Sequence, residues 1–359
     1  MTAGVSVGVS LGAALLLALT SAAAAAPRTS SVERISTTGD GTQANGASAD
    51  AVISDDGRYA AFLSRAENLG CAEAFPCMQV KDLATGAVTA VTEGGGFWWG
   101  PPSISGDGRS VGYSAGSRLP APYLYDRRTG HSQRIWPAAP PSDAELGEVW
   151  SVSRHGTHIA YVLGNRAGSA FTRYLYVRDT ATGTDELISG AAEPPKAAAS
   201  LSADGRVVAY MTGHTSDGPE DTADVFVVDR ATGRKVQADA GLGQGRLIRL
   251  SDDGRYVVLD AQGGTYVRDL RTGRLVRAAD TPAVATSRDA RHLLLSGADG
   301  LRLLDRRTGR STVVGPAGAQ AVPGAVSAGG RATVFGSAAA DLVAGDANDA
   351  ADIFVRRPR

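Results

Sequence analysis

Hydrophobic and polar positions alternate in short runs along most of the chain, and glycine-containing turns separate the runs. In the first clear example, an apolar run leads to Ser54, the turn Asp55-Asp56-Gly57 follows, and a second apolar run extends from Tyr59 to Phe62. Alternation with a period of two predicts half-buried β-strands. Asp-Gly between two such runs predicts a tight hairpin, because glycine accepts a positive φ. The pattern therefore predicts pairs of antiparallel strands.

This strand pair, spelled Ser-x-Asp-Gly-Arg at its turn, is repeated along the chain. Five clear copies and two weaker ones begin at Ser54, Ser105, Ser153, Ser202, Ser251, Ser287 and Ser327. A second element, a strand that runs into Asp-x-x-Thr-Gly, occurs six times, from Asp82–Gly86 to Asp305–Gly309. One repeat thus carries four strands, and such units stacked radially form a β-propeller. We predict an all-β, seven-bladed propeller, with a six-bladed ring as the alternative.

The two ends of the repeat region predict how the ring closes. The seventh repeat ends after its third strand, Asp352–Arg356, and no Asp-x-x-Thr-Gly follows it. Residues 32–36, Val-Glu-Arg-Ile-Ser, look like the fourth strands of the other repeats. We expect this segment to complete the last blade and to remove an exposed sheet edge.

The strand pair Ser-x-Asp-Gly-Arg-x-x-Ala-Phe/Tyr resembles the PD40, or WD40-like, repeats of the TolB-like propeller family, which also occur in prolyl-oligopeptidase propellers. The resemblance covers roughly residues 32–356, and the tail at residues 337–355 looks like a variant common in exported bacterial members. It implies the propeller fold. It implies little about function, because the motif residues shape turns and core.

The N-terminal residues resemble an export signal. Residues 5–26 are small and apolar, with leucines at their centre and the run Ala22–Ala26 before Pro27. This order is typical of a secretory signal peptide, and an uncleaved membrane anchor is the alternative. We expect a signal peptide over residues 1–26 and one propeller domain over 27–359, secreted or otherwise outside the cytoplasm. In an oxidising compartment, Cys71 and Cys77 are predicted to form a local disulfide.

Charge and composition narrow the partners. Lysine and arginine number 36 and aspartate and glutamate 37, so the net charge is −1. A near-neutral chain argues against a dedicated nucleic-acid binder. We expect a monomer without a transmembrane segment after signal cleavage, and a partner that is an envelope or extracellular protein or glycan.

Two groups of residues are candidates for binding. Trp98 and Trp99 lie in a glycine-rich link and offer flat apolar faces to a sugar or peptide; plugging the ring entrance is the alternative. Trp150 lies on an inner strand and is expected in the core. A run of oxygen-bearing side chains has spacings used by calcium sites, with ordinary turn roles as the alternative: Asp346, Asn348, Asp349 and Asp352. No other cofactor is expected.

Catalytic motifs are absent from the linear sequence. Gly-x-Ser-x-Gly is spelled at residues 4–8, in the apolar N-terminal run, and at 112–116, at the second strand of a repeat. Neither copy is the strand-to-helix elbow of a hydrolase, and no phosphate-binding loop occurs. We therefore expect a non-enzymatic scaffold that binds a protein or glycan. The alternative is a propeller enzyme of the lyase or lactonase type, with a site assembled from several blades, acting on an extracellular polysaccharide or lactone.

Overall fold

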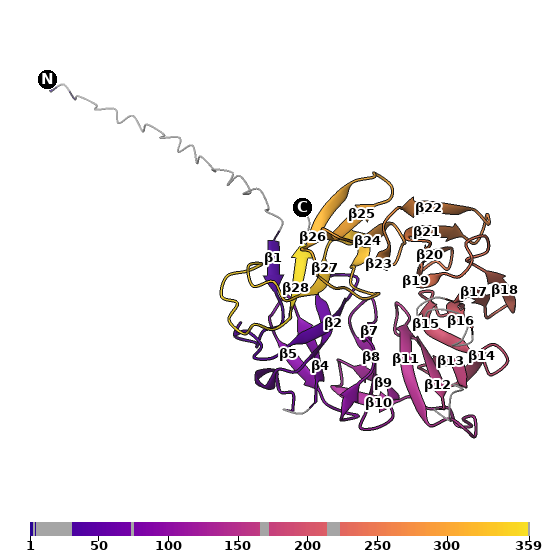
Figure 1. The fold of residues 1–359 in the computed structure, drawn as a ribbon. Coiled ribbons are helices and arrows are strands. Elements are labelled where there is room, and N and C mark those ends of the chain that lie inside the picture. The colour runs from indigo at the N-terminus through magenta and orange to yellow at the C-terminus, as the bar shows by residue number, and fades with distance from the viewer. Residues whose placement is uncertain (3, 5–30, 73–74, 166–171, 214–222, 358–359) are drawn as a thin grey trace.

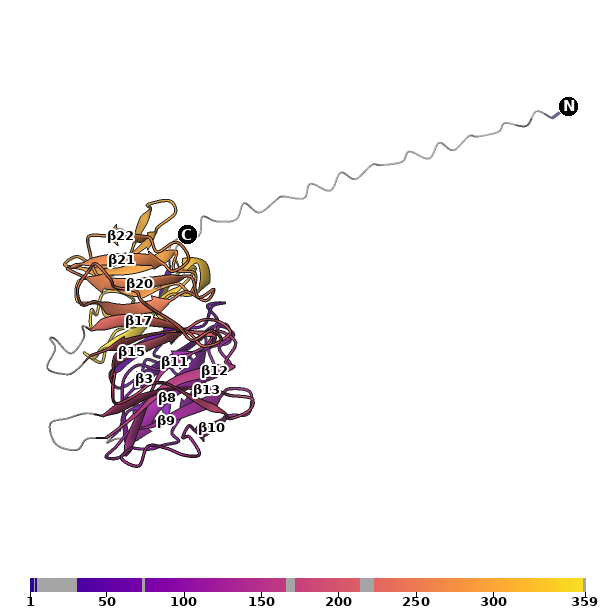
Figure 2. The same ribbon diagram turned by 90° about the vertical axis from the view of Figure 1, so that its right-hand side faces the viewer.

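Seven antiparallel sheets follow one another around a ring in this computed structural model, which describes residues 1–2, 4, 31–72, 75–165, 172–213 and 223–357. Figure 1 shows the sheets in chain order from β2 to β28, with β1 beside β28, and Figure 2 shows the same ring from the side. The predicted seven-bladed, all-β propeller is confirmed. The proposed signal peptide lies almost entirely outside the described residues.

The first four blades each contain an inner strand followed by outer strands. Blade 1 consists of β2 (Ser48–Ile53), β3 (Tyr59–Ser64), β4 (Cys77–Asp82) and β5 (Val88–Val91). Blade 2 consists of β6 (Phe97–Trp98), β7 (Ser103–Ile104), β8 (Ser110–Gly116), β9 (Ala121–Asp126) and β10 (His131–Arg134). Blade 3 consists of β11 (Leu146–Val152), β12 (His158–Gly164), β13 (Arg173–Asp179) and β14 (Asp185–Ser189). Blade 4 consists of β15 (Pro195–Leu201), β16 (Val207–Thr212), β17 (Asp224–Asp229) and β18 (Arg234–Gln237).

The remaining blades complete the ring. Blade 5 consists of β19 (Arg246–Leu250), β20 (Tyr256–Ala261), β21 (Gly264–Asp269) and β22 (Leu275–Ala279). Blade 6 consists of β23 (Ala283–Thr286), β24 (His292–Gly297), β25 (Gly300–Asp305) and β26 (Ser311–Gly315). Blade 7 consists of β27 (Thr333–Ser337), β28 (Asp352–Arg357) and β1 (Ser31–Arg34). Two 3₁₀ turns, η1 (Glu67–Leu69) and η2 (Ala328–Gly330), are the helical elements of the described residues, and neither is long enough to cross a membrane.

Blade 7 is built from both ends of the described propeller. β1 pairs with β28 in antiparallel register, with Ser31 opposite Arg357 and Arg34 opposite Phe354. The inner edge of this blade is reduced to isolated bridges, such as Val326 with Thr333. The predicted closure by the N-terminal segment is therefore what the structure shows, although the strand begins one residue earlier than expected and ends two residues sooner.

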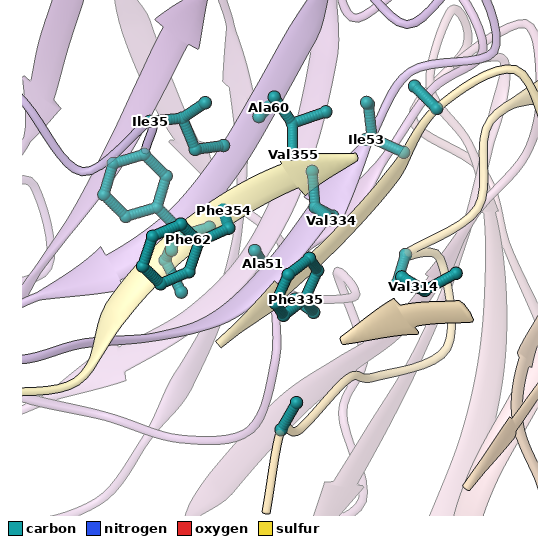
Figure 3. Packing of buried hydrophobic residues seen from close by; sticks show 14 of the residues in the cluster. Ile35, Ala51, Ile53, Ala60, Phe62, Val314, Val334, Phe335, Phe354 and Val355 are labelled. Atoms are coloured by element: carbon teal, nitrogen blue, oxygen red, sulfur yellow. The ribbon is translucent and has the colours of Figure 1, made fainter. Parts of the chain in front are cut away.

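The largest hydrophobic cluster lies at this closure. It joins residues of blades 1, 6 and 7 with residues of the lead-in, the segment 35–47 between β1 and β2. Phe335 stacks on Phe354 with ring centroids 5.6 Å apart. Figure 3 shows Phe62 of blade 1 beside Phe354 of β28. Burial of apolar side chains is the main favourable term in folding, so the same contacts that fill the core also hold the ends of the ring together.

Five of the seven inner hairpins, in blades 1, 2, 4, 5 and 6, follow the same hydrogen-bond plan. The hydroxyl of Ser54 donates to the carboxylate of Asp56, which accepts the backbone N–H of Arg58. The arginine then forms an ion pair with the aspartate of Asp-x-x-Thr-Gly, Asp82, at 2.9 Å. Equivalent pairs occur in blades 2, 4, 5 and 6. The spelling of the repeat thus records the geometry of its two turns.

Candidate functional site

The Ser-x-Asp-Gly turns meet around the ring axis on one side of the molecule, which we call the turn face. Backbone N–H groups at the second turn position donate to the same position of the next blade: Ala328 to Asp55, Asp55 to Gly106, and Gly106 to Arg154, at 2.7–3.0 Å. Ala203 to Asp252 and Asp252 to Arg288 continue the series, both at 2.8 Å. The second position of each turn is therefore brought to the axis.

Four of these axial positions are charged and form what we call the axial charge cluster: Asp55, Arg154, Asp252 and Arg288. Arg288 lies 2.7 Å from Asp55 and 3.5 Å from Asp252, and Arg154 lies 2.9 Å and 3.6 Å from the same two carboxylates. Burial raises the pKa of Asp252, and the surrounding arginines oppose that shift. Arg288 lines both the space along the axis and a hollow on the turn face, so the cluster separates the two.

Arg249, from β19, enters the space along the axis. This axial cavity has a volume of about 50 Å³ and is lined by inner-strand residues of blades 1–5, together with Arg288 and the segment 323–326. Nε of Arg249 is buried and has no hydrogen-bond partner among the described residues. Burial, and then the charge of Arg288, lower the pKa of Arg249 to about 9.

A larger space, the mouth hollow, adjoins the axial cavity at the other end of the inner strands. Its volume is about 280 Å³, and it shares Ser103, Trp150, Ala199, Ile248 and Pro323 with the axial cavity. Glu148 and Arg246 line it near the starts of β11 and β19, whereas the turn face follows the ends of these strands. The hollow is therefore open on the face opposite the charge cluster.

The mouth hollow combines aromatic faces with a few polar groups. Trp99 and Trp150 line it, and both are half-buried. Glu148 is the one carboxylate among its described lining residues, and Arg246 forms an ion pair with Asp260 at 3.0 Å. A mostly apolar pocket with few convergent polar groups is the usual form of a small-molecule site.

The two predicted tryptophans have different surroundings. Trp98 stacks on Tyr113 with centroids 4.7 Å apart, and Tyr113 stacks on Tyr123 at 5.2 Å. Trp99 lines the mouth hollow, and its buried indole nitrogen has no hydrogen-bond partner among the described residues. Binding through these residues stays a prediction, and the structure favours Trp99 as the member of the pair that can touch a ligand.

Trp150 was expected in the core, and the structure places it differently. The pairing of β11 with β12 shifts register between Val149 and Ser151, so a bulge falls at Trp150. A bulge re-aims the side chain at that point. Trp150 packs against a core cluster of blades 3 and 4, and it also lines the axial cavity and the mouth hollow.

Three of the predicted calcium residues contact the N-terminal part of the propeller, residues 34–44. Asp346 and Asp352 form ion pairs with Arg34 at 3.2 Å and 3.0 Å. Asn348 donates to the Ala44 carbonyl, and Asp349 adopts a positive φ of 48°. Calcium binding at these residues stays a prediction. Among the described residues, no group of three or more His, Cys, Asp or Glu side chains is arranged to hold a metal ion.

The predicted disulfide is present. Cys71 and Cys77 are joined, with their Cα atoms 5.3 Å apart. The side-chain amide of Gln79 donates to both sulfurs. Disulfides are typical of oxidising compartments, so this bond is consistent with a protein that lies outside the cytoplasm.

Sequence reasoning missed Arg249, Arg288, Arg246 and Glu148. A signal for Arg249 exists in the repeat. In blades 2, 3 and 4, the position two residues before the turn serine is itself a serine: Ser103, Ser151 and Ser200. The hydroxyl of each of these serines accepts a backbone N–H of the next blade. Blade 5 has Arg249 at this position instead of serine. Blades 1, 6 and 7 have Val52, Ala285 and Ala325 at this position, so Arg249 is the one charged residue there, and its charge indicates a different role.

Comparison with known proteins identifies the class as a propeller. No family model and no curated protein matches the chain. Among solved structures, an oligogalacturonate lyase in complex with manganese matches with a TM-score of 0.65 and 14% identity, covering 91% of this chain and 93% of that one. An oligogalacturonate lyase from Vibrio parahaemolyticus matches with a TM-score of 0.62, 14% identity and the same coverage.

A TolB from Acinetobacter baumannii matches with a TM-score of 0.46 and 15% identity, over 74% of this chain and 62% of that one. The seven-bladed ring of Ser-x-Asp-Gly-Arg hairpins is what confirms the resemblance to TolB-like propellers, at the level of the fold. The prediction of a non-enzymatic scaffold is wrong: two solved structures that cover 91% of this chain are lyases, and the enzyme alternative fits them better.

The described residues do not gather the ligands that a manganese ion, as in the first lyase, would need. His155 and His158 lie at the turn of blade 3, His131 lies on β10 and His292 on β24, so the four described histidines come from three blades. No described set of ligands gathers at the axial cavity or elsewhere, and His214 lies outside the described residues. The described residues therefore do not fit a manganese site.

Proposed function

We propose that this protein is a lyase that acts on an acidic oligosaccharide in the mouth hollow. The observation that carries the proposal is the hollow itself: it has two tryptophans, one carboxylate and an arginine, at the axis of a propeller whose near-complete matches are oligogalacturonate lyases. Flat aromatic faces suit sugar rings. Arginine suits the carboxylate of a uronic acid.

The chemistry assigned to the site is an elimination. Glu148 takes the proton from the carbon next to the sugar carboxylate, and the electron pair left behind forms a carbon–carbon double bond. The glycosidic carbon–oxygen bond breaks, and the departing oxygen takes up the proton that Glu148 accepted. Arg246 faces the same hollow and contributes positive charge where the carboxylate gains electron density.

The test is turnover of oligogalacturonate, followed by the ultraviolet absorbance of the new double bond conjugated to the carboxylate. Glu148→Gln is expected to lower kcat by about 10²–10⁴-fold, the usual contribution of a general base. Glu145→Gln is the matched control, because Glu145 is exposed, only three residues before Glu148 and absent from the hollow lining. No turnover of any acidic oligosaccharide by the unmodified protein would contradict the proposal.

Export is part of the same proposal. The apolar N-terminal residues and the Cys71–Cys77 disulfide support a protein that meets its substrate outside the cytoplasm. Mass spectrometry of the secreted form gives the cleavage position, which we expect near residue 26. Calcium at the residues 346–352 remains a candidate, to be checked by metal analysis of the same material.

A further inference from the structure

Charge is unbalanced along the ring axis. Three guanidinium groups, of Arg154, Arg249 and Arg288, lie with the carboxylates of Asp55 and Asp252. Arg154 and Arg288 each contact both carboxylates. Arg249 forms no ion pair among the described residues, so one positive charge on the axis is left without a counter-charge.

An unmatched charge in a protein interior is unfavourable unless something compensates it. The carboxylates nearest to Arg249, those of Asp55 and Asp252, already pair with the other two arginines. Burial and the charge of Arg288 hold the pKa of Arg249 below its usual range. Replacing the serine of blades 2–4 with this arginine also removes a hydrogen bond between blades. An anion bound in the axial cavity would compensate this charge.

The sizes of the two spaces decide what part of a ligand reaches Arg249. A water needs roughly 10–15 Å³ of such volume, so the axial cavity of about 50 Å³ holds only a few water-sized groups. That is room for a carboxylate and not for a sugar ring. The adjoining mouth hollow, about 280 Å³, takes the larger part of a ligand and carries the tryptophans.

We propose that Arg249 binds the carboxylate of a sugar acid whose ring lies in the mouth hollow, and that this guanidinium supplies the positive charge that a metal would otherwise supply. The inference rests on the proposed function for the choice of a sugar acid. It also explains why the described residues do not form a metal site: the guanidinium of Arg249 already supplies a positive charge at the axis. Binding of the acid is thus independent of divalent ions.

Calorimetric binding of galacturonate in the presence of EDTA tests this, because binding can be measured without turnover. Charge-assisted hydrogen bonds contribute about 1.5–3 kcal/mol, so Arg249→Met is expected to weaken galacturonate binding roughly 10- to 100-fold. Arg271→Met, an exposed arginine on the turn after β21, is the matched control and is expected to bind as the unmodified protein does. Arg249→Lys keeps the charge and is expected to retain part of the affinity.

Three results would overturn the inference. They are unchanged affinity in both Arg249 variants while their melting curves remain cooperative, loss of binding to the unmodified protein on adding EDTA, and equal binding of neutral galactose. Acetate is the remaining probe, and we expect it to bind more weakly than galacturonate because it lacks the ring. Galacturonate binding that depends on Arg249 without turnover would contradict only the lyase proposal. Turnover that is indifferent to Arg249 would contradict only this inference.

Discussion

Neighbouring residues of one turn have different roles in this protein. Asp55 and Asp56 both belong to the first Ser-x-Asp-Gly turn, and the sequence treats both as turn formers. Asp56 accepts hydrogen bonds within its own hairpin, as expected. Asp55 instead reaches the axis and pairs with arginines of blades 3 and 6. Only the closed ring brings these positions together, so no local pattern could have separated the two roles.

A buried lysine gives a pH-dependent test at the same scale. Lys81 is 5% exposed and donates to the carbonyl of Thr37, which ties the lead-in to blade 1. Burial lowers the pKa of Lys81 to about 8, against about 10.4 in an unfolded chain.

Between these two pKa values the unfolded chain binds the proton more tightly than the folded protein does. The free energy of unfolding therefore increases as the pH rises. Urea unfolding of the unmodified protein and Lys81→Met at pH 7, 8, 9 and 10 measures the effect. We expect the difference between them to move by roughly 1–3 kcal/mol in favour of the unmodified protein from pH 8 to 10. A difference that stays flat over this range would contradict the buried-cation assignment.

At the scale of the elements, hairpins were predictable and bulges were not. Asp-Gly turns have a local cause, since their glycines take a positive φ and their aspartates cap the turn. The bulge at Trp150 depends on pairing with β12, and it converts an expected core residue into a lining residue of the mouth hollow. The same limitation hid the site, because Glu148 comes from blade 3 and Arg246 and Arg249 from blade 5.

The turn glycines also pack one blade against the next. A Cβ added to Gly254, which has φ +68°, would lie 2.9 Å from Cγ2 of Val207 in the preceding blade. Gly233 has φ +69° but no atom within 4 Å of such a Cβ.

Gly254→Ala is therefore expected to lose about 1–3 kcal/mol more than Gly233→Ala, because overpacking adds to the shared backbone strain. Thermal melting of the two variants side by side measures the difference. Equal losses of stability would contradict this expectation and would mean that the two blades move apart to accommodate the added methyl group.

At the scale of the whole molecule, ring closure rests on a buried ionic group. Asp352 is fully buried and binds Arg34, Ser36 and Gln43, all from the N-terminal segment. The sequence predicted that this segment closes the ring, because the last repeat lacks a fourth strand. It gave no sign that Asp352 would bind Arg34.

Arg34→Ala is expected to destabilise the fold by about 3–5 kcal/mol, since it leaves a buried carboxylate without its cation. Arg109→Ala removes an equivalent but exposed pair with Asp126 and is expected to cost about 0–1 kcal/mol. Denaturant unfolding of both variants supplies the comparison. Similar losses would show that closure depends on apolar packing alone.

The pairing of β1 with β28 has a topological consequence. Ser31 and Arg357 lie opposite each other in one sheet, so a linker of a few residues would join the two ends. The chain could then be opened in an exposed loop within another blade and keep every strand neighbour it has now. Blade 7 would become one continuous segment, and the opened blade would be held by hydrogen bonds in its place. The blade that combines strands from both ends of the chain is therefore set by where the chain begins, and the ring itself would accept another blade in that role.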